Sequence, residues 1–211
     1  MKKSETVLAM GDSITEGGKE FTCYRQFLVP KLQEMGVQVK FIGPKSDNIS
    51  AHAGYGGKNV AFLLDKSKEI YSAYPADIVL LHAGHNNFSQ DKPVPGIVHD
   101  TEAIIRNFAH INPDVTVLLA QVIPSGKLPK YSYIPELNNE LKALAERLTK
   151  EGLRVVLVDQ ADRFDWTTDT IGDMVHPNAE GARKMAEKWL AALGPQLKRD
   201  VRVNGKVKSD N

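Results

Sequence analysis

The chain has 211 residues and a formal net charge of +1, with 42% hydrophobic and 25% charged residues. That length fits one domain with a full hydrophobic core. The balanced charge gives no electrostatic basis for binding nucleic acid or an anionic membrane. A single cysteine, Cys23, excludes an internal disulfide, and no apolar stretch approaches the roughly 20 residues that a membrane-spanning helix needs.

The N-terminal segment does not have the pattern of a secretory signal peptide. Residues 1–5 are basic, but the apolar run after them is short and meets Gly11 and Asp12 at once. The compartment therefore stays open between the cytoplasm and secretion after removal of a leader.

Short apolar runs rich in β-branched residues alternate with stretches of helical periodicity along the chain. The runs predict strands at residues 6–10, 39–42, 78–83, 115–122 and 155–158. The periodic stretches predict helices at residues 24–35, 59–74, 96–111, 134–150 and 179–193. Five alternations of strand and helix predict an α/β fold, a three-layer α/β/α sandwich with a five-stranded parallel sheet.

Residues 1–197 form the predicted domain, and residues 198–211 form a basic C-terminal tail. The tail alternates around Asn204 and Gly205, which is a hairpin signal, but a lone hairpin is marginal in water. We expect the tail to fray rather than dock on the domain. We also expect its basic side chains to form a solvated end rather than a binding patch: Lys198, Arg199, Arg202, Lys206 and Lys208.

Four segments with reactive or hydrogen-bonding groups follow predicted strands. Ser13 follows the first strand, the glycine loop at residues 54–57 the second and residues 84–87 the third. Asp173 and His176 lie in the loop after the fifth strand. In open parallel sheets ligands bind beyond the carboxyl ends of the strands. We therefore expect these segments to meet at one edge of the sheet.

Ser13, Asp173 and His176 have the chemistry of a charge-relay nucleophile. A serine hydroxyl needs a base to take its proton, and the base needs a partner that orients it. Pro177 holds His176 extended and Asn178 can cap the last helix, so Asp173 can accept the imidazole Nδ1–H while Nε2 faces Ser13. The alternatives are structural: Ser13 as a helix N-cap or turn serine, and His176 as a capping-region histidine bonded to Asp173.

The developing negative charge of an acyl-transfer reaction needs hydrogen-bond donors. The candidates are the backbone N–H of Ser13, a backbone N–H in the glycine-rich loop 52–59 and the side-chain amide of Asn86. The loop has alternatives as a phosphate cradle or a flexible turn, although it matches neither the Walker pattern nor a dinucleotide fingerprint. Asn86 and Asn87 can equally form a turn that tolerates left-handed backbone.

The histidines do not predict a metal site. His82 and His85 straddle a strand end, and no cysteine or carboxylate ligand set accompanies them in the sequence. His52, His99 and His110 are scattered. We therefore expect neither a structural nor a catalytic metal, and no cofactor.

Together, these segments resemble the sequence blocks of the SGNH hydrolases, also called the GDSL esterase and lipase superfamily, over residues 11–178. The resemblance implies a flavodoxin-like SGNH hydrolase fold. The catalytic triad that it implies consists of Ser13, Asp173 and His176. The oxyanion donors that it implies are Ser13, Gly57 and Asn86.

The match to the family blocks has one ambiguity and two departures. Gly54 and Gly56 are alternatives to Gly57 in the second block. Asn87 replaces the usual aspartate of the third block, a change that affects the hydrogen bonds supporting the site and not the donor Asn86 itself. Met174 stands in the last block at a position where glycine is common.

Within the superfamily, the chain is most similar to bacterial carbohydrate esterases, which remove acetyl groups from xylan and related polysaccharides. Residues 39–44, 52–57 and 173–178 carry this similarity. It implies a polysaccharide or small-molecule ester substrate, hydrolysed through an acyl-enzyme. Aromatic side chains in or near the predicted edge loops can stack on sugar rings or serve as ordinary loop packing: Tyr55, Tyr131, Tyr133, Phe164 and Trp166.

Two other functions stay open on the sequence alone. A lysophospholipase, arylesterase or acyl-thioesterase has the same catalytic residues but a lipid or thioester substrate. The second alternative is a carbohydrate-binding relative that has lost its activity, and the replacement of the usual aspartate by Asn87 would be the sign of that loss. The sequence does not determine the oligomeric state.

Overall fold

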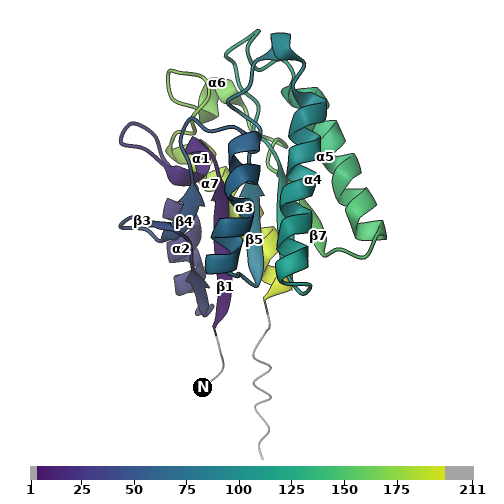
Figure 1. Ribbon diagram of the computed structural model, residues 1–211. Helices are drawn as coiled ribbons and strands as arrows, with labels where there is room; N and C mark the ends of the chain where they lie inside the picture. Colours follow the sequence, from purple (N-terminus) through teal and green to yellow (C-terminus); the bar gives the residue numbers. More distant parts are fainter. Residues whose placement is uncertain (1–3, 198–211) are drawn as a thin grey trace, which may run out of the picture.

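The computed structural model of the protein describes residues 4–197. Helices cover both faces of a central sheet (Figure 1). The predicted hairpin or frayed tail at residues 198–211 lies outside the described residues.

Within residues 4–197 the sheet has seven strands, β1 Glu5–Gly11, β2 Val39–Phe41, β3 Lys45–Ser46, β4 Ala51–Gly54, β5 Ile78–His82, β6 Thr116–Gln121 and β7 Val155–Asp159. Their order is β3-β4-β1-β5-β6-β7, with β2 paired to β1. Every pairing is parallel except that of β3 with β4. The predicted α/β class and its mainly parallel sheet are confirmed.

The prediction of five strands is wrong because two segments share the position beside β1. β2 pairs with the first half of β1, from Glu5 to Val7, and β4 pairs with its end, at Met10 and Gly11. Between them the chain passes through β3, which adds an antiparallel pair at the edge. The sequence of β4, Ala-His-Ala-Gly, has no β-branched residue and gives no strand signal. The glycine loop consequently follows β4 and not the segment at residues 39–42.

Two helices cover one face of the sheet and three cover the other. α2 Arg25–Glu34 packs with α7 Ala179–Leu193 on one face, and α3 Val60–Ala73, α4 Val94–Ile111 and α5 Ile134–Lys150 stand side by side on the other (Figure 1). The one-turn helices α1 Ser13–Glu16 and α6 Trp166–Asp169 and the 3-10 turn Ser89–Asp91 lie in loops, whereas the 3-10 turn Gly194–Gln196 directly continues α7. All five predicted helices are present, although α4 begins at Val94 instead of residue 96.

Strand residues alternate between the two faces, so each side of the sheet has its own core. Leu8 and Met10 of β1 pack in the cluster under α3, α4 and α5, whereas Val7 packs with α2 and α7. β5 is buried along its whole length, as a central parallel strand must be. On α5 the predicted apolar stripe is buried: Leu137, Leu141, Leu144 and Leu148. No helix of the described chain is long and apolar enough to cross a membrane.

The carboxyl ends of β1, β4 and β5 lie next to one another, at an edge that we call the rim. Gly11, the last residue of β1, is in register with Gly54 at the end of β4 and with His82 at the end of β5. Side chains that directly follow these three strands are therefore brought together by the sheet itself.

A buried arginine ties the loop after β1 to the turn between β3 and β4. The Arg25 side chain is 0% exposed. Its Nε donates to the carbonyl oxygen of Thr15 at 2.8 Å, and its Nη2 donates to the carbonyl oxygen of Glu16 at 2.8 Å and to Asp47 Oδ2 at 2.7 Å. Asp47 Oδ1 accepts the backbone N–H of Ser50 at 3.0 Å. The planar guanidinium thus fixes α1 relative to β4.

Replacing Arg25 with lysine should lower the free energy of unfolding by about 3 kcal/mol, because one ammonium group cannot satisfy two carbonyls and a partly buried carboxylate. Chemical denaturation measures this loss. The matched control is Lys31→Met, which breaks an ion pair with Glu34 whose side chains are 58% and 66% exposed. This control should change the free energy by less than about 0.5 kcal/mol. Equal losses in the two variants would contradict the role given to Arg25.

Candidate active site

Ser13 is the first residue of α1 and directly follows the loop from β1. The N-cap of α1 is Asp12, whose Oδ1 accepts the backbone N–H of Ile14 at 3.0 Å. The structural alternative for Ser13 as an N-cap is therefore wrong. Its hydroxyl instead contacts an imidazole from the far end of the chain, with 2.8 Å between Ser13 Oγ and His176 Nε2.

The turn from Asp173 to His176 orients that imidazole. Asp173 Oδ2 lies 2.5 Å from His176 Nδ1, and Asp173 Oδ1 accepts the backbone N–H groups of Val175 and His176 at 2.9 and 3.0 Å. Partial burial raises the pKa of Asp173, but these hydrogen bonds outweigh it and hold the pKa below its ordinary value. The carboxylate therefore stays ionised, and His176 Nε2 faces the hydroxyl of Ser13.

The backbone on either side of His176 supports this turn. Met174 has a φ of +61°, a left-handed conformation that glycine adopts without strain, which accounts for the frequent glycine at this family position. The Met174 carbonyl accepts hydrogen bonds from Ser125 Oγ and from the N–H of Gly126. After the turn, Asn178 caps α7 by accepting the N–H groups of residues 180 and 181, as predicted.

Phe21 is a contact of the imidazole that sequence reasoning missed. Its ring stacks on the ring of His176, with 4.1 Å between centroids and 26° between planes. The N–H of the next residue, Thr22, donates to the carbonyl of Pro177 at 3.2 Å. No local pattern signals this contact, because it joins the loop after α1 to the loop before α7.

The loop after β4 lies against Ser13, and among residues 4–197 one of its three candidate glycines has an N–H without a partner. A Cβ built on Gly56 would stand 3.8 Å from the Cβ of Ser13. The N–H groups of Gly54, Tyr55 and Gly56 are bonded to His52 Nδ1, the Gly11 carbonyl and Glu16 Oε2 respectively. Among the hydrogen bonds of residues 4–197, none engages the N–H of Gly57, whose φ is +73°. Of the three candidate glycines, Gly57 is the one that can donate to a ligand.

Asn86 contacts this loop through its side-chain amide. Its φ of +65° matches the predicted left-handed turn. Its Nδ2 donates to the carbonyl of Lys58, next to Gly57, at 3.0 Å, which leaves its second amide hydrogen for a ligand. Asn87, the departure from the family pattern, has a buried Oδ1 with no hydrogen-bond partner among the described residues.

An ion pair that the sequence did not reveal holds the glycine loop. Glu16 Oε2 accepts the N–H of Gly56 at 2.5 Å, while Oε1 pairs with the ammonium of Lys45. Lys45 Nζ also donates to the carbonyl of Gly54 at 3.0 Å. The loop is therefore tied to α1 and β3 and is not the flexible turn considered as an alternative.

One expectation about the histidines is wrong. The sequence showed no carboxylate beside His82 and His85, but Asp12 lies there, and each of the three offers a possible ligand atom within 4.8 Å of the others. All three side chains are buried. Asp12 belongs to the loop after β1, which the pairing of β1 with β5 brings beside them.

Of the two alternatives for the aromatic residues in or near the edge loops, ordinary loop packing holds for most of them. Three are at most 6% exposed, which excludes ring stacking on a sugar: Tyr131, Tyr133 and Phe164. Tyr55 packs edge-on against Phe62, and the Trp166 ring packs against Gly126. The exposed large apolar side chains of the loops at the rim are different ones, Phe88, Leu128 and Met174, at 46%, 63% and 39% exposure.

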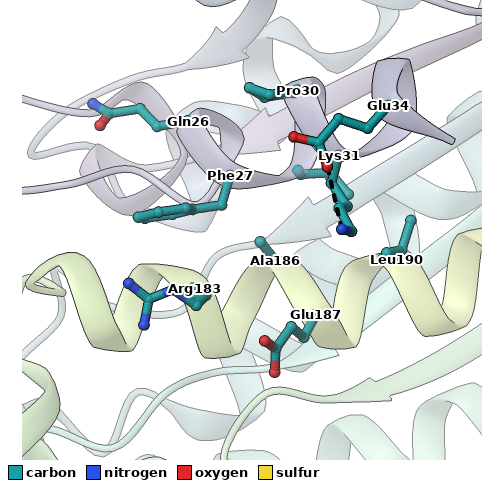
Figure 2. A pocket seen from close by; sticks show the side chains of 10 residues that line it. Gln26, Phe27, Pro30, Lys31, Glu34, Arg183, Ala186, Glu187 and Leu190 are labelled. Carbon is teal, nitrogen blue, oxygen red and sulfur yellow. Dashed lines mark hydrogen bonds and ion pairs between the residues drawn. The ribbon is translucent and has the colours of Figure 1, made fainter.

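A separate hollow of about 320 Å³ lies between α2 and α7 (Figure 2). Figure 2 shows Phe27 and the Lys31–Glu34 pair of α2 facing Arg183 and Leu190 of α7. None of the residues of the Ser13 site lines it. The hollow therefore has no part in the chemistry of the rim.

Residues 9–184 match the GDSL-like Lipase/Acylhydrolase family. A multidomain esterase from Ruminococcus flavefaciens is 24% identical over 230 aligned positions, which cover 91% of this chain and 29% of the relative. The chain thus spans less than a third of the length of that curated relative.

Solved structures with the same fold include two family 3 carbohydrate esterases. The one from Talaromyces cellulolyticus has a TM-score of 0.81 at 22% identity, over 90% of this chain and 97% of that chain. The one from Clostridium thermocellum has a TM-score of 0.79 at 22% identity, over 92% and 96%. A variant of an acetyl xylan esterase from Geobacillus stearothermophilus has a TM-score of 0.67 at 20% identity, over 92% and 97%. At these identities the likeness establishes the fold.

Replacing Asp173 with asparagine should lower kcat for an ester substrate about 10³- to 10⁴-fold without unfolding the turn. The asparagine Oδ1 can still accept the two backbone N–H groups, but its Nδ2 would face His176 Nδ1 as a second donor and favour the wrong tautomer. Steady-state kinetics measures the loss.

The matched control is Asp165→Asn, the same chemical change at a cap that serves only the N–H and hydroxyl of Thr167. That variant should keep kcat within about threefold of the original. Similar kcat values for the Asp173 and Asp165 variants would remove Asp173 from the site.

Proposed function

The chain belongs to the GDSL-like lipase/acylhydrolase family, and we propose that it is a carboxylic ester hydrolase that removes O-acetyl groups from a carbohydrate such as xylan. We further propose that Ser13 carries the acyl group and that His176 and Asp173 complete a catalytic triad. The observation that carries the proposal is the unbroken chain of contacts from Ser13 Oγ to His176 Nε2 at 2.8 Å and from His176 Nδ1 to Asp173 Oδ2 at 2.5 Å.

In the first half of the reaction Ser13 Oγ attacks the ester carbonyl while His176 Nε2 takes its proton. Asp173 holds the imidazole by Nδ1 and stabilises the imidazolium that forms. The tetrahedral intermediate collapses when the C–O bond to the sugar breaks, and His176 Nε2–H protonates the leaving alcohol. An acetyl group then remains on Ser13.

Three donors stabilise the negative oxygen of the intermediate in this proposal. They are the N–H of Ser13, the N–H of Gly57 and the second amide hydrogen of Asn86. Their support is that Gly57 has no other hydrogen-bond partner among residues 4–197 and that Asn86 is fixed beside it through the Lys58 carbonyl. Removing one such donor typically costs about 10²- to 10³-fold in rate.

Water completes the cycle by the same route in reverse. His176 Nε2 takes a proton from a water molecule, whose oxygen attacks the acetyl carbonyl. The intermediate releases acetate when the bond to Ser13 Oγ breaks, and Oγ regains its proton from His176. The ring of Phe21, stacked on His176 at 4.1 Å, keeps the imidazole in one orientation through both halves.

The choice of an acetylated carbohydrate is supported by two observations. The structural relatives with the highest TM-scores given above are carbohydrate esterases, and a further one is an acetyl xylan esterase. In addition, the exposed aromatic ring of Phe88 has the ammonium of Lys130 over it, 4.6 Å from its centroid. An apolar ring beside a hydrogen-bond donor suits the apolar face and the hydroxyls of a sugar ring.

Replacing Ser13 with alanine should lower the hydrolysis of p-nitrophenyl acetate by several orders of magnitude, because the attacking atom is removed. Circular dichroism and the melting temperature should remain as in the original protein. Ser72→Ala, an exposed serine on α3, is the matched control and should keep its rate. An active Ser13→Ala variant would refute the acyl-enzyme.

A panel of p-nitrophenyl esters separates the acetyl-directed function from a lipid-directed one. kcat/KM for the acetyl ester should exceed that for the octanoyl ester at least tenfold, and acetylated xylan or mannan should release acetate. The reverse order of chain length would favour the lysophospholipase or thioesterase alternative. No reaction with any ester would favour the inactive carbohydrate-binding relative.

A further inference from the structure

Two buried polar side chains directly precede, in the sequence, two of the residues proposed to act in the reaction. Asp12 precedes Ser13, and His85 precedes Asn86; they are 0% and 2% exposed. Asp12 Oδ2 stands 3.8 Å from His85 Nδ1, and neither atom has a hydrogen-bond partner in the described chain. Buried polar atoms in folded proteins almost always have partners, so this contact needs a physical explanation.

The proton on the His85 ring can be located from its other nitrogen. His85 Nε2 lies 3.1 Å from the carbonyl oxygen of Ile123, which can only accept, so Nε2 carries the hydrogen. Burial lowers the pKa of His85 to about 4, so at neutral pH the ring has this single N–H. His85 Nδ1 therefore presents a lone pair toward Asp12.

Asp12 faces that lone pair with its remaining oxygen. Its Oδ1 is engaged with the N–H of Ile14 at 3.0 Å, which leaves Oδ2 toward His85. An ionised Asp12 would set two lone pairs opposite each other in a buried site with no hydrogen between them, an arrangement that costs free energy. Burial raises the pKa of Asp12 to about 7. Below this pH the protonated carboxyl supplies the missing hydrogen.

We propose that Asp12 is a neutral carboxylic acid that donates its Oδ2–H to Nδ1 of His85, and that this bond positions the Ser13 loop against the Asn86 loop. The two heavy atoms lie about 1 Å beyond the usual hydrogen-bond length, so the proposed bond requires the Asp12 carboxyl to turn toward His85 by about that distance. Asp12 and His85 are positioning residues, because neither reaches the ester in the proposed reaction. The catalytic consequence rests on the proposed function, whereas the bond itself does not.

The other titratable groups around the pair leave this assignment in place. Burial lowers the pKa of His82 to about 3, so His82 is neutral. Tyr24 and Tyr133, which interact electrostatically with Asp12, are neutral because burial raises the pKa of both. The remaining titratable groups that act on His85 are His176 and Lys130, and both lower its pKa further. No neighbour therefore makes His85 the cation of an ion pair.

A metal ion is the competing occupant of this cluster. His82 Nε2 accepts the N–H of Ile123 at 3.4 Å, so the hydrogen of the neutral His82 ring is on Nδ1. A protonated Nδ1 has no lone pair with which to bind a metal ion. The hydrogen-bond pattern at Ile123 favours a proton over a metal.

The change Asp12→Asn tests the protonation of Asp12 directly. An asparagine keeps an acceptor for Ile14 and offers an Nδ2–H to His85, but it cannot ionise. The folded pKa of Asp12, about 7, lies above its value of 3.8 in an unfolded chain, so the original protein loses stability as pH rises from about 4 to about 7. Above pH 7 no further loss comes from Asp12.

The melting temperature of Asp12→Asn minus that of the original protein should therefore increase from pH 4 to pH 7 and then level off. The subtraction cancels the other groups that titrate in both proteins. A constant difference over this range would show that Asp12 is already ionised at low pH and would overturn the proposal. This measurement does not depend on activity, so its outcome is separate from that of the Ser13→Ala experiment.

Kinetics tests the positioning role. Asp12→Ala removes the hydrogen that Asp12→Asn retains, so kcat at pH 7 should be at least tenfold lower in the alanine variant, with KM changed less than threefold. Equal kcat losses in the two variants would show that the carboxylate charge matters and would contradict the proposal. Stoichiometric metal in the original protein that the asparagine variant lacks would also contradict it.

The unaltered protein provides a test that does not depend on the folding of any variant. In long-range proton–nitrogen spectra of histidine-labelled protein, His85 should be the neutral Nε2–H tautomer from pH 5.5 to pH 8. His85→Gln identifies its signals by their loss. A doubly protonated His85 ring at pH 7 would mean an ion pair with an ionised Asp12 and would overturn the assignment.

Discussion

The hydrogen bond between Ser13 and His176 joins two residues that are 163 positions apart in the sequence, and the remaining features of the site depend on it. A hydrogen bond between residues so far apart in the sequence forms readily only if the backbone around each of them is already fixed, because ordering two loops costs conformational entropy. The β1 strand and the Asp12 cap fix the serine. The Asp173 turn and the Asn178 cap fix the imidazole.

The backbone around the proposed oxyanion donors is also held in place by specific contacts. The glycine loop is held by Glu16, itself a residue of α1, and by Lys45 of β3. Arg25 donates a hydrogen bond to the backbone carbonyl of Glu16. The helix α1, which begins with Ser13, therefore also holds the loop that contains Gly57. Preorganised donors of this kind need no rearrangement when charge develops, which is where their catalytic value lies.

The sequence predicted the layered fold and the catalytic candidates because both depend on local or ordered signals. Buried parallel strands give continuous apolar runs, and the order of motifs along the chain maps onto one edge of the sheet. The prediction of five strands was wrong because β3 and β4 are short and β4 has small residues instead of β-branched ones. The closing turn was predictable, since Pro177 and Asn178 act on adjacent residues.

Contacts between distant segments were not predictable in the same way. Phe21 against His176, Glu16 against Gly56 and Asp12 beside His85 each join residues without any shared periodicity. The sequence left open, for a related reason, whether the aromatic residues near the rim stack on sugars or pack in the loops. Tyr131, Tyr133 and Phe164 lie in loops by sequence, yet the loops fold back and bury them, while Phe88 is left exposed. Loop burial depends on tertiary packing, which local sequence does not encode.

The most direct test of the Ser13–His176 bond is the rate and place of labelling by a fluorophosphonate, followed by tandem mass spectrometry. A serine activated by an adjacent imidazole should be modified rapidly, with the adduct on Ser13, and His176→Ala should slow labelling at least 100-fold. An adduct on another residue, or equal labelling rates with and without His176, would mean that the contact at 2.8 Å does not activate the hydroxyl.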